Sequence, residues 1–161
     1  MLSITEKLTT PATPQATLTL PFDLRQKSRL RVTLDDGREA GLILARGTLL
    51  RGGDLLRADD GTVIEVRAAI ESVSTAFARD AELLTRAAYH LGNRHIAVQI
   101  GATWLRYVHD HVLDHMLEQL GLQVTFEAAP FETEAGAYEG HSAHTHAPLY
   151  RAHEHHSHSH D

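Results

Sequence analysis

The spacing of the apolar residues changes near residue 69, and this change constrains the possible folds of the 161-residue chain more than any other feature. Before that point apolar and polar residues alternate, for example over residues 30–34, as they do in strands. After it, segments with the three- to four-residue spacing of a helix are mixed with segments that alternate. The chain is therefore expected to be α+β, with an all-β domain over residues 1–69.

Two Asp-Asp-Gly sequences lie in the first segment, at residues 35–37 and 59–61. Asp and Gly accept the backbone angles of tight turns, and strand-like residues lie on both sides of each sequence. The first turn joins residues 30–34 to residues 40–44, and the second joins residues 55–57 to residues 62–66. Both patterns predict hairpins.

The pattern after residue 69 predicts a second domain over residues 70–138. Strands are expected at residues 70–77, 95–100, 103–108 and 123–127. A first helix has Leu84, Ala88 and Leu91 on its apolar face and ends at Gly92, and a second helix ends at Gly121. The apolar stripe of the second helix consists of Val112, Leu113, Met116, Leu117 and Leu120. The resulting β-α-β-β-α-β order is that of a ferredoxin-like domain.

The composition and motifs exclude several classes of protein. The formal net charge is −6, and no cluster of Lys and Arg that could neutralise phosphates occurs, so no nucleic acid is expected as a partner. The apolar runs are far shorter than the roughly 20 residues that span a bilayer, and no signal peptide is recognised. A cytoplasmic protein without a membrane partner is expected. Neither a phosphate-binding loop nor a nucleophile elbow is found, so the protein is not expected to be an enzyme.

Histidine is the residue type that points to a function. The chain has 13 His and no Cys, so a transition-metal site must use imidazole with carboxylate, backbone or water. Eight of them lie in residues 139–161, a segment expected to be disordered because it has few large apolar residues. We expect these eight to bind divalent metal rather than to form a purification tag or a solvated spacer. They are His141, His144, His146, His153, His155, His156, His158 and His160.

Three histidines of the expected second domain are further candidate metal ligands. A lone His at a helix–strand junction is more often structural, so His95 would need other ligands or its own copy across the two-fold axis of a homodimer. His109 and His111 flank Asp110 and are interpreted either as a surface metal pair or as part of a segment in which Asp110 caps a helix. The remaining candidates are interpreted mainly as helix-surface residues: His90, Asp114 and His115.

Several segments resemble the UreE urease accessory proteins. Similarity to that family is carried by Tyr89-His90-Leu91-Gly92-Asn93-Arg94-His95, Leu105-Arg106 and His109-Asp110-His111-Val112-Leu113, and by residues 29–47 and 52–67. The resemblance implies a homodimeric nickel chaperone with a peptide-binding first domain and a ferredoxin-like, metal-binding second domain. Such a protein supplies Ni(II) for assembly of the urease active site, together with the accessory GTPase UreG and the urease apoprotein complex.

The same resemblance implies roles for individual histidines. His95 would be an interface ligand contributed by each subunit, and His109 and His111 would form a peripheral site that only some members have. Because imidazole sites prefer copper to nickel by affinity alone, Zn(II) or Cu(II) could also bind in vitro, and nickel rests on the resemblance. A histidine-rich buffer or storage protein for Ni, Zn or Cu is the alternative. The separate β-domain favours a carrier, which needs a surface for docking on a partner.

Overall fold

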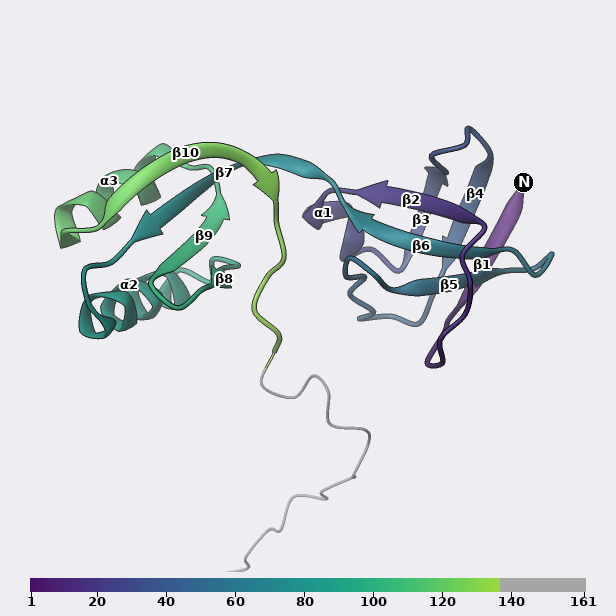
Figure 1. Ribbon diagram of the computed structural model, residues 1–161, viewed down its shortest axis with the longest axis horizontal. Helices are drawn as coiled ribbons and strands as arrows, with labels where there is room; N and C mark the ends of the chain where they lie inside the picture. The colour runs from purple at the N-terminus through teal and green to yellow at the C-terminus, as the bar shows by residue number, and fades with distance from the viewer. Residues whose placement is uncertain (137–161) are drawn as a thin grey trace, which may run out of the picture.

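The computed structural model describes residues 1–136 and shows two units side by side (Figure 1). The first unit contains strands β1 to β6 and the short helix α1, and the second contains β7 to β10 with helices α2 and α3. The expected tail, residues 139–161, lies outside the described residues. Within residues 1–136, no helix is long and apolar enough to cross a membrane.

A six-stranded sheet forms the first unit. Its elements are β1 (Leu2–Lys7), β2 (Ala16–Leu20), α1 (Phe22–Arg25), β3 (Arg29–Thr33), β4 (Glu39–Ile43), β5 (Leu55–Ala58) and β6 (Val63–Ala68). The strand order is β2-β6-β5-β1-β4-β3. The antiparallel pairs β3–β4 and β5–β6 confirm both predicted hairpins. β1, which is not among the predicted strands, lies between β5 and β4 and is parallel to β4.

Apolar side chains from alternate strand positions fill the interior of this unit. Removal from water stabilises the fold by roughly 1.5–3 kcal/mol for each fully buried Leu or Ile side chain. The largest of these completely buried residues come from five of the six strands and are Ile4, Leu18, Leu42, Leu56 and Ile64.

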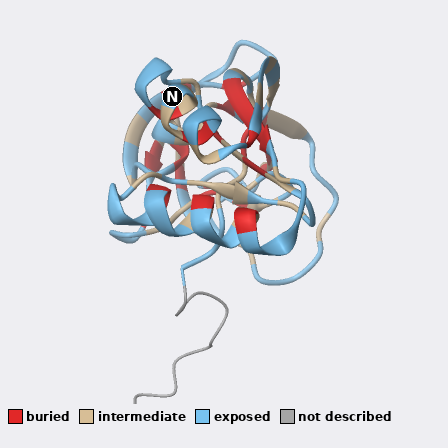
Figure 2. Ribbon diagram, turned by 90° about the vertical axis from the view of Figure 1, so that its left-hand side faces the viewer, coloured by how far each residue is buried: buried red, intermediate tan, exposed pale blue. Residues whose placement is uncertain are grey.

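The second unit is a four-stranded antiparallel sheet with two helices packed against it. Its elements are β7 (Ile70–Phe77), α2 (Ala81–Asn93), β8 (Gln99–Ile100), β9 (Trp104–Val108), α3 (His111–Leu120) and β10 (Gln123–Pro130). The strand order is β10-β7-β9-β8. Each helix exposes its outer face to solvent and buries a narrow face against the sheet (Figure 2). The buried core residues are Ala76, Leu83, Ala87, Leu91, Leu105, Tyr107, Leu113, Leu117 and Leu122.

The end of α2 differs from the prediction. The helix continues past Gly92, and His95 ends it instead, with a φ of 56°. The His95 N–H donates to the Gly92 carbonyl at 3.0 Å, and the Ile96 N–H donates to the Leu91 carbonyl at 3.1 Å. This pair of bonds is the Schellman motif, in which the left-handed residue is usually glycine. The turn leaves only the two residues of β8 in place of the strand predicted over residues 95–100.

The buried faces of the helices also differ from the predicted stripes. On α2, Leu84 and Ala88 are only partly buried, because the fully buried face is centred one position earlier. On α3, Val112 is 63% exposed although the predicted stripe includes it. Gly121 has a φ of 105° and follows α3 directly, which confirms the predicted end of that helix.

The buried side chain of Arg25 connects the two units. It is 1% exposed and donates hydrogen bonds to the carbonyl oxygens of Leu20 at 3.0 Å, of Leu50 at 3.2 Å and of Phe131. Its guanidinium nitrogen also lies 3.3 Å from a carboxylate oxygen of Glu132. Because Phe131 and Glu132 directly follow β10, these contacts hold the end of the second unit against the first.

Candidate metal centre

His109, His111 and Asp114 lie together where β9 ends and α3 begins. One potential ligand atom from each residue can be chosen so that all three atoms lie within 4.8 Å of one another. Among residues 1–136, these residues form the one group of three or more His and carboxylate side chains that lie close enough together to hold a metal ion. Asp114, which the sequence places mainly on the helix surface, is instead mostly shielded from solvent, with 17% of its side chain exposed.

The local backbone explains why these residues meet. The His109 N–H donates to the Ser72 carbonyl at 3.1 Å, which fixes the segment after β9 against β7. Asp110 then caps α3, as one of the two interpretations expects, by accepting hydrogen bonds from the N–H groups of Val112 at 2.8 Å and Leu113 at 3.2 Å. His111 is therefore the first residue of α3.

A partly buried group of polar side chains supports one side of the His109 ring. The ring nitrogen Nδ1 lies 3.0 Å from the Ser74 hydroxyl oxygen and 3.2 Å from Oδ2 of Asp114. The Tyr107 hydroxyl donates to Oδ1 of the same aspartate at 2.6 Å. Burial, and then the hydrogen bond to Asp114, raise the pKa of Tyr107 well above its ordinary value, so it stays a proton donor at neutral pH.

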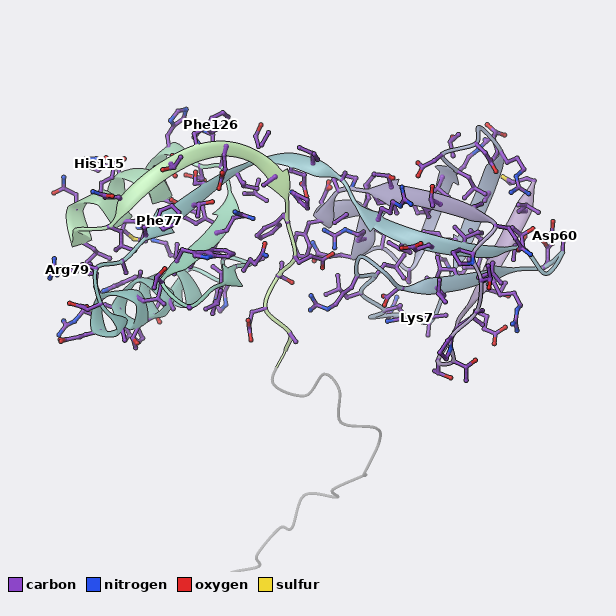
Figure 3. The ribbon with its side chains drawn as sticks, in the orientation of Figure 1. Lys7, Asp60, Phe77, Arg79, His115 and Phe126 are labelled. Atoms are coloured by element: carbon purple, nitrogen blue, oxygen red, sulfur yellow. The ribbon has the colours of Figure 1, made fainter. Side chains whose placement is uncertain are left out.

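Aromatic contacts hold the other parts of the ring. The centroids of the His109 and His111 rings are 4.8 Å apart, and those of His109 and Phe126 are 4.6 Å apart, both in edge-to-face geometry. Phe126 lies on β10 and remains 60% exposed, while His115 lies on the neighbouring helix α3 (Figure 3). The site is thus at the surface, with one ordered side and one open side.

The donor set suits a borderline transition metal. Two imidazoles and a carboxylate are ligands that zinc, copper and nickel accept, and an open side leaves room for water or for ligands of a second protein. His115 is exposed and is not part of this group, so the helical spacing of His111 and His115 does not by itself create a site here. Sequence reasoning missed Asp114, and only its spacing one turn after Asp110 could have drawn attention to it.

His95 lies in a different setting. It is exposed at the end of α2, in the left-handed conformation, and it does not belong to the group around His109. His90, five residues earlier on α2, is also exposed. The eight histidines predicted to bind metal in residues 139–161 lie outside the described residues.

Comparison with known proteins assigns both parts of the chain to one family. The model of the N-terminal domain of the UreE urease accessory protein matches residues 3–69, and that of the C-terminal domain matches residues 62–161. The urease accessory protein UreE of Alkalilimnicola ehrlichii is 61% identical over 140 residues, which cover 87% of this chain and 86% of that protein. Its counterpart from Citrobacter koseri is 58% identical over 147 residues, with 89% and 97% covered. The chain therefore belongs to the UreE family of urease accessory proteins, which are chaperones and not enzymes.

Proposed function

We propose that this protein is a nickel metallochaperone that delivers Ni(II) for assembly of the urease active site. Membership of the UreE family supports a role in urease maturation. The observation that carries the metal-binding part is the pair of His109 and His111, whose ring centroids lie 4.8 Å apart beside the Asp114 carboxylate. Because these ligands also suit zinc and copper, the choice of nickel as the cargo rests on the family.

We further propose a homodimer in which His95 of each subunit contributes one ligand to a shared nickel site. A two-fold interface brings the same residue of both chains together, so one His per chain supplies two ligands. Three features of the surface support this arrangement: His95 is exposed and held in an unusual backbone conformation, Tyr89 is a large exposed aromatic residue, and Gly92 has open space where a side chain would lie. A glycine allows close approach of another backbone.

The other histidines are proposed to supplement this shared site. His109 and His111 would bind a second, peripheral ion, and the eight histidines of residues 139–161 would raise the number of ions that each dimer carries. A metal site with few protein ligands keeps positions that another protein can occupy. Such a site can release its ion to a partner, as a carrier requires.

We propose domains at residues 1–69 and 70–138 and a histidine-rich tail at residues 139–161. The sheet order β10-β7-β9-β8 with both helices packed against the sheet supports a ferredoxin-like second domain. The first domain would bind the protein partners, which are the accessory GTPase UreG and the urease apoprotein complex, in the cytoplasm. A metal buffer would not need this separate folded unit, and its presence favours delivery over storage.

Nickel transfer to the urease apoprotein complex tests this function. Nickel-loaded protein is added to the apoprotein complex with UreG and GTP, in the presence of a chelator that removes free nickel. Urease activity should rise well above that obtained with the same amount of nickel chloride, and His95→Ala should remove most of the increase. Equal activation by nickel chloride and by the loaded protein would argue against a carrier and favour the metal buffer.

A further inference from the structure

The two ring nitrogens of His109 have different surroundings. Nδ1 faces Ser74 and Asp114, whereas Nε2 makes no hydrogen bond within residues 1–136. A neutral imidazole carries its proton on one nitrogen and can bind a metal only through the other. The position of that proton therefore decides which side of the ring can act as a ligand.

The network around Asp114 determines where the proton lies. An ionised carboxylate can only accept hydrogen bonds, and Oδ1 of Asp114 already accepts one from the Tyr107 hydroxyl at 2.6 Å. Oδ2 lies 3.2 Å from Nδ1 of His109, so a favourable contact there requires a proton on Nδ1. An unprotonated Nδ1 would place two lone pairs against each other at a site that is mostly shielded from water.

Ser74 is consistent with the same assignment. Its side chain is completely buried, and its hydroxyl oxygen lies 3.0 Å from Nδ1 of His109. A hydroxyl oxygen can accept a hydrogen bond from a protonated Nδ1 at this distance. With the proton on Nδ1, the Asp114 carboxylate faces a donor at each of its two oxygens.

We propose that Asp114 is a positioning residue which, with Tyr107, holds His109 in the Nδ1-protonated form and leaves Nε2 free to bind the metal ion. The proposal rests on the metal-carrier function and adds to it the atom of His109 that binds and the residue that prepares it. A carboxylate that accepts from the distal nitrogen of a metal-binding His fixes the ring orientation and makes the ligand more basic. Asp114 would then support the peripheral site without touching the ion itself.

Nitrogen NMR of the full-length protein measures the proton position directly. The chain is labelled with ¹⁵N-histidine, and spectra are recorded without metal in mildly alkaline buffer, where imidazole is neutral. The His109 signals are those lost in His109→Gln. The expected result is one tautomer with the proton on Nδ1. A proton on Nε2 in the wild-type protein would overturn the proposal, independently of any metal measurement.

Zinc, which is diamagnetic, is then added as the probe metal. The Nε2 signal of His109 should shift, and the zinc concentration needed for this shift should rise about 10-fold to 100-fold in Asp114→Asn, the usual effect of removing such a partner. Without metal, the same variant should show a mixture of both tautomers, and Tyr107→Phe should show a smaller change in the same direction. Glu118→Gln removes a carboxylate one turn further along α3 and should behave as wild type.

The outcomes separate this proposal from the proposed function. A single Nδ1-protonated form with unchanged zinc binding in Asp114→Asn would overturn the positioning role. Loss of zinc binding in Asp114→Asn without any change of tautomer would also overturn it, because the carboxylate would then be a direct ligand. If zinc shifts no His109 signal in the wild-type protein, the metal function of this site fails, while the tautomer is still decided by the metal-free spectra.

Discussion

His95 is the non-glycine residue with a positive φ among residues 1–136. A side chain in the left-handed region costs roughly 1 kcal/mol because its Cβ approaches the backbone, and such strain is found disproportionately at functional sites. Glycine would satisfy the same Schellman motif without this cost. An imidazole at this position therefore lowers the stability of the fold relative to glycine, which fits the proposed ligand role.

Replacement of His95 by Gly should stabilise the metal-free protein. Relief of the left-handed strain favours the folded state, and the larger entropy of glycine in the unfolded chain opposes it. The free energy of unfolding should rise by roughly 0.5–1 kcal/mol. Thermal unfolding should show a midpoint about 2 °C higher for a chain of this size. His95→Ala is the control, since it removes the imidazole but keeps the Cβ and should give no gain. A lower midpoint for His95→Gly would show that the side chain makes stabilising contacts.

Individual residues were predictable where one local signal decides their role. Asp110 is followed directly by a helical stripe, which suffices to identify a cap. The role of Asp114 was not recognised because it depends on Tyr107 and His109, which lie on a strand or directly after it. The residue spacing within a helix gives no information about such contacts. His95 was identified as a candidate, but its backbone conformation was not, since Gly92 offered the more usual helix end.

At the scale of elements, α3 determines where the candidate ligands lie. Asp110 accepts from two N–H groups of the first turn, and His111 and Asp114 are held by that same turn. Asp110→Ala should therefore lower the free energy of unfolding by about 1 kcal/mol, as for other N-cap replacements, and should also weaken zinc binding at His109 and His111. Urea denaturation and zinc titration are the measurements.

The cap of the other helix provides a matched control. Asp80 accepts from the Leu83 N–H at 2.8 Å and caps α2. Asp80→Ala should cost a similar amount of stability and leave zinc binding at His109 unchanged. If both variants weaken zinc binding equally, the effect comes from general destabilisation and not from the start of α3.

Strand β10 carries a carboxylate whose ionisation should stabilise the second unit. The hydrogen bond from the Thr75 hydroxyl and the nearby Arg106 guanidinium hold the pKa of Glu127 below its ordinary value of 4.5. Because the pKa is lower in the folded state, the stabilisation is present above pH 4.5 and is lost as the pH falls through the folded-state pKa. Denaturation series from neutral to acidic pH should show a weaker acid dependence for Glu127→Gln than for wild type. Identical pH dependence would contradict this assignment.

Sequence alternation predicted the strands of both hairpins and also those over residues 70–77 and 123–127, which pair with each other as β7 and β10. In the β3–β4 and β5–β6 hairpins a turn sequence lies directly between the two strands, so the sequence itself indicates which strands pair. β1 pairs with β4 and β5, which lie more than 30 residues away, and no turn sequence joins it directly to either partner. β8 is short because the turn at His95 uses the residues that alternation assigned to a strand.

At the scale of the whole molecule, Arg25 is the residue that joins the units. Arg25→Met would leave the carbonyl oxygens of Leu20, Leu50 and Phe131 without this donor, and Glu132 without its buried partner. Loss of several buried hydrogen bonds of this kind should cost about 3 kcal/mol. Denaturation should show the lower free energy of unfolding, and amide hydrogen exchange should become faster in the residues that follow β10.

An exposed arginine of the first unit serves as the control for this variant. Arg57 makes a single exposed ion pair with Glu6 at 3.6 Å. Arg57→Met should change the stability by less than about 1 kcal/mol. An equal effect of the two substitutions would mean that Arg25 does not hold the units together.

The proposed function of the whole molecule depends on nickel held by histidine at a site that two subunits share. Calorimetric titration with Ni(II) of the chain without residues 141–161 tests this most directly, because the tail histidines no longer add to the heat. Wild type should bind about one tight ion per dimer, as the two-fold symmetry requires. His95→Ala should lose this ion and remain dimeric, and the double variant His109→Ala with His111→Ala should keep it. A His95→Ala protein that binds the same ion with unchanged affinity would contradict the shared site.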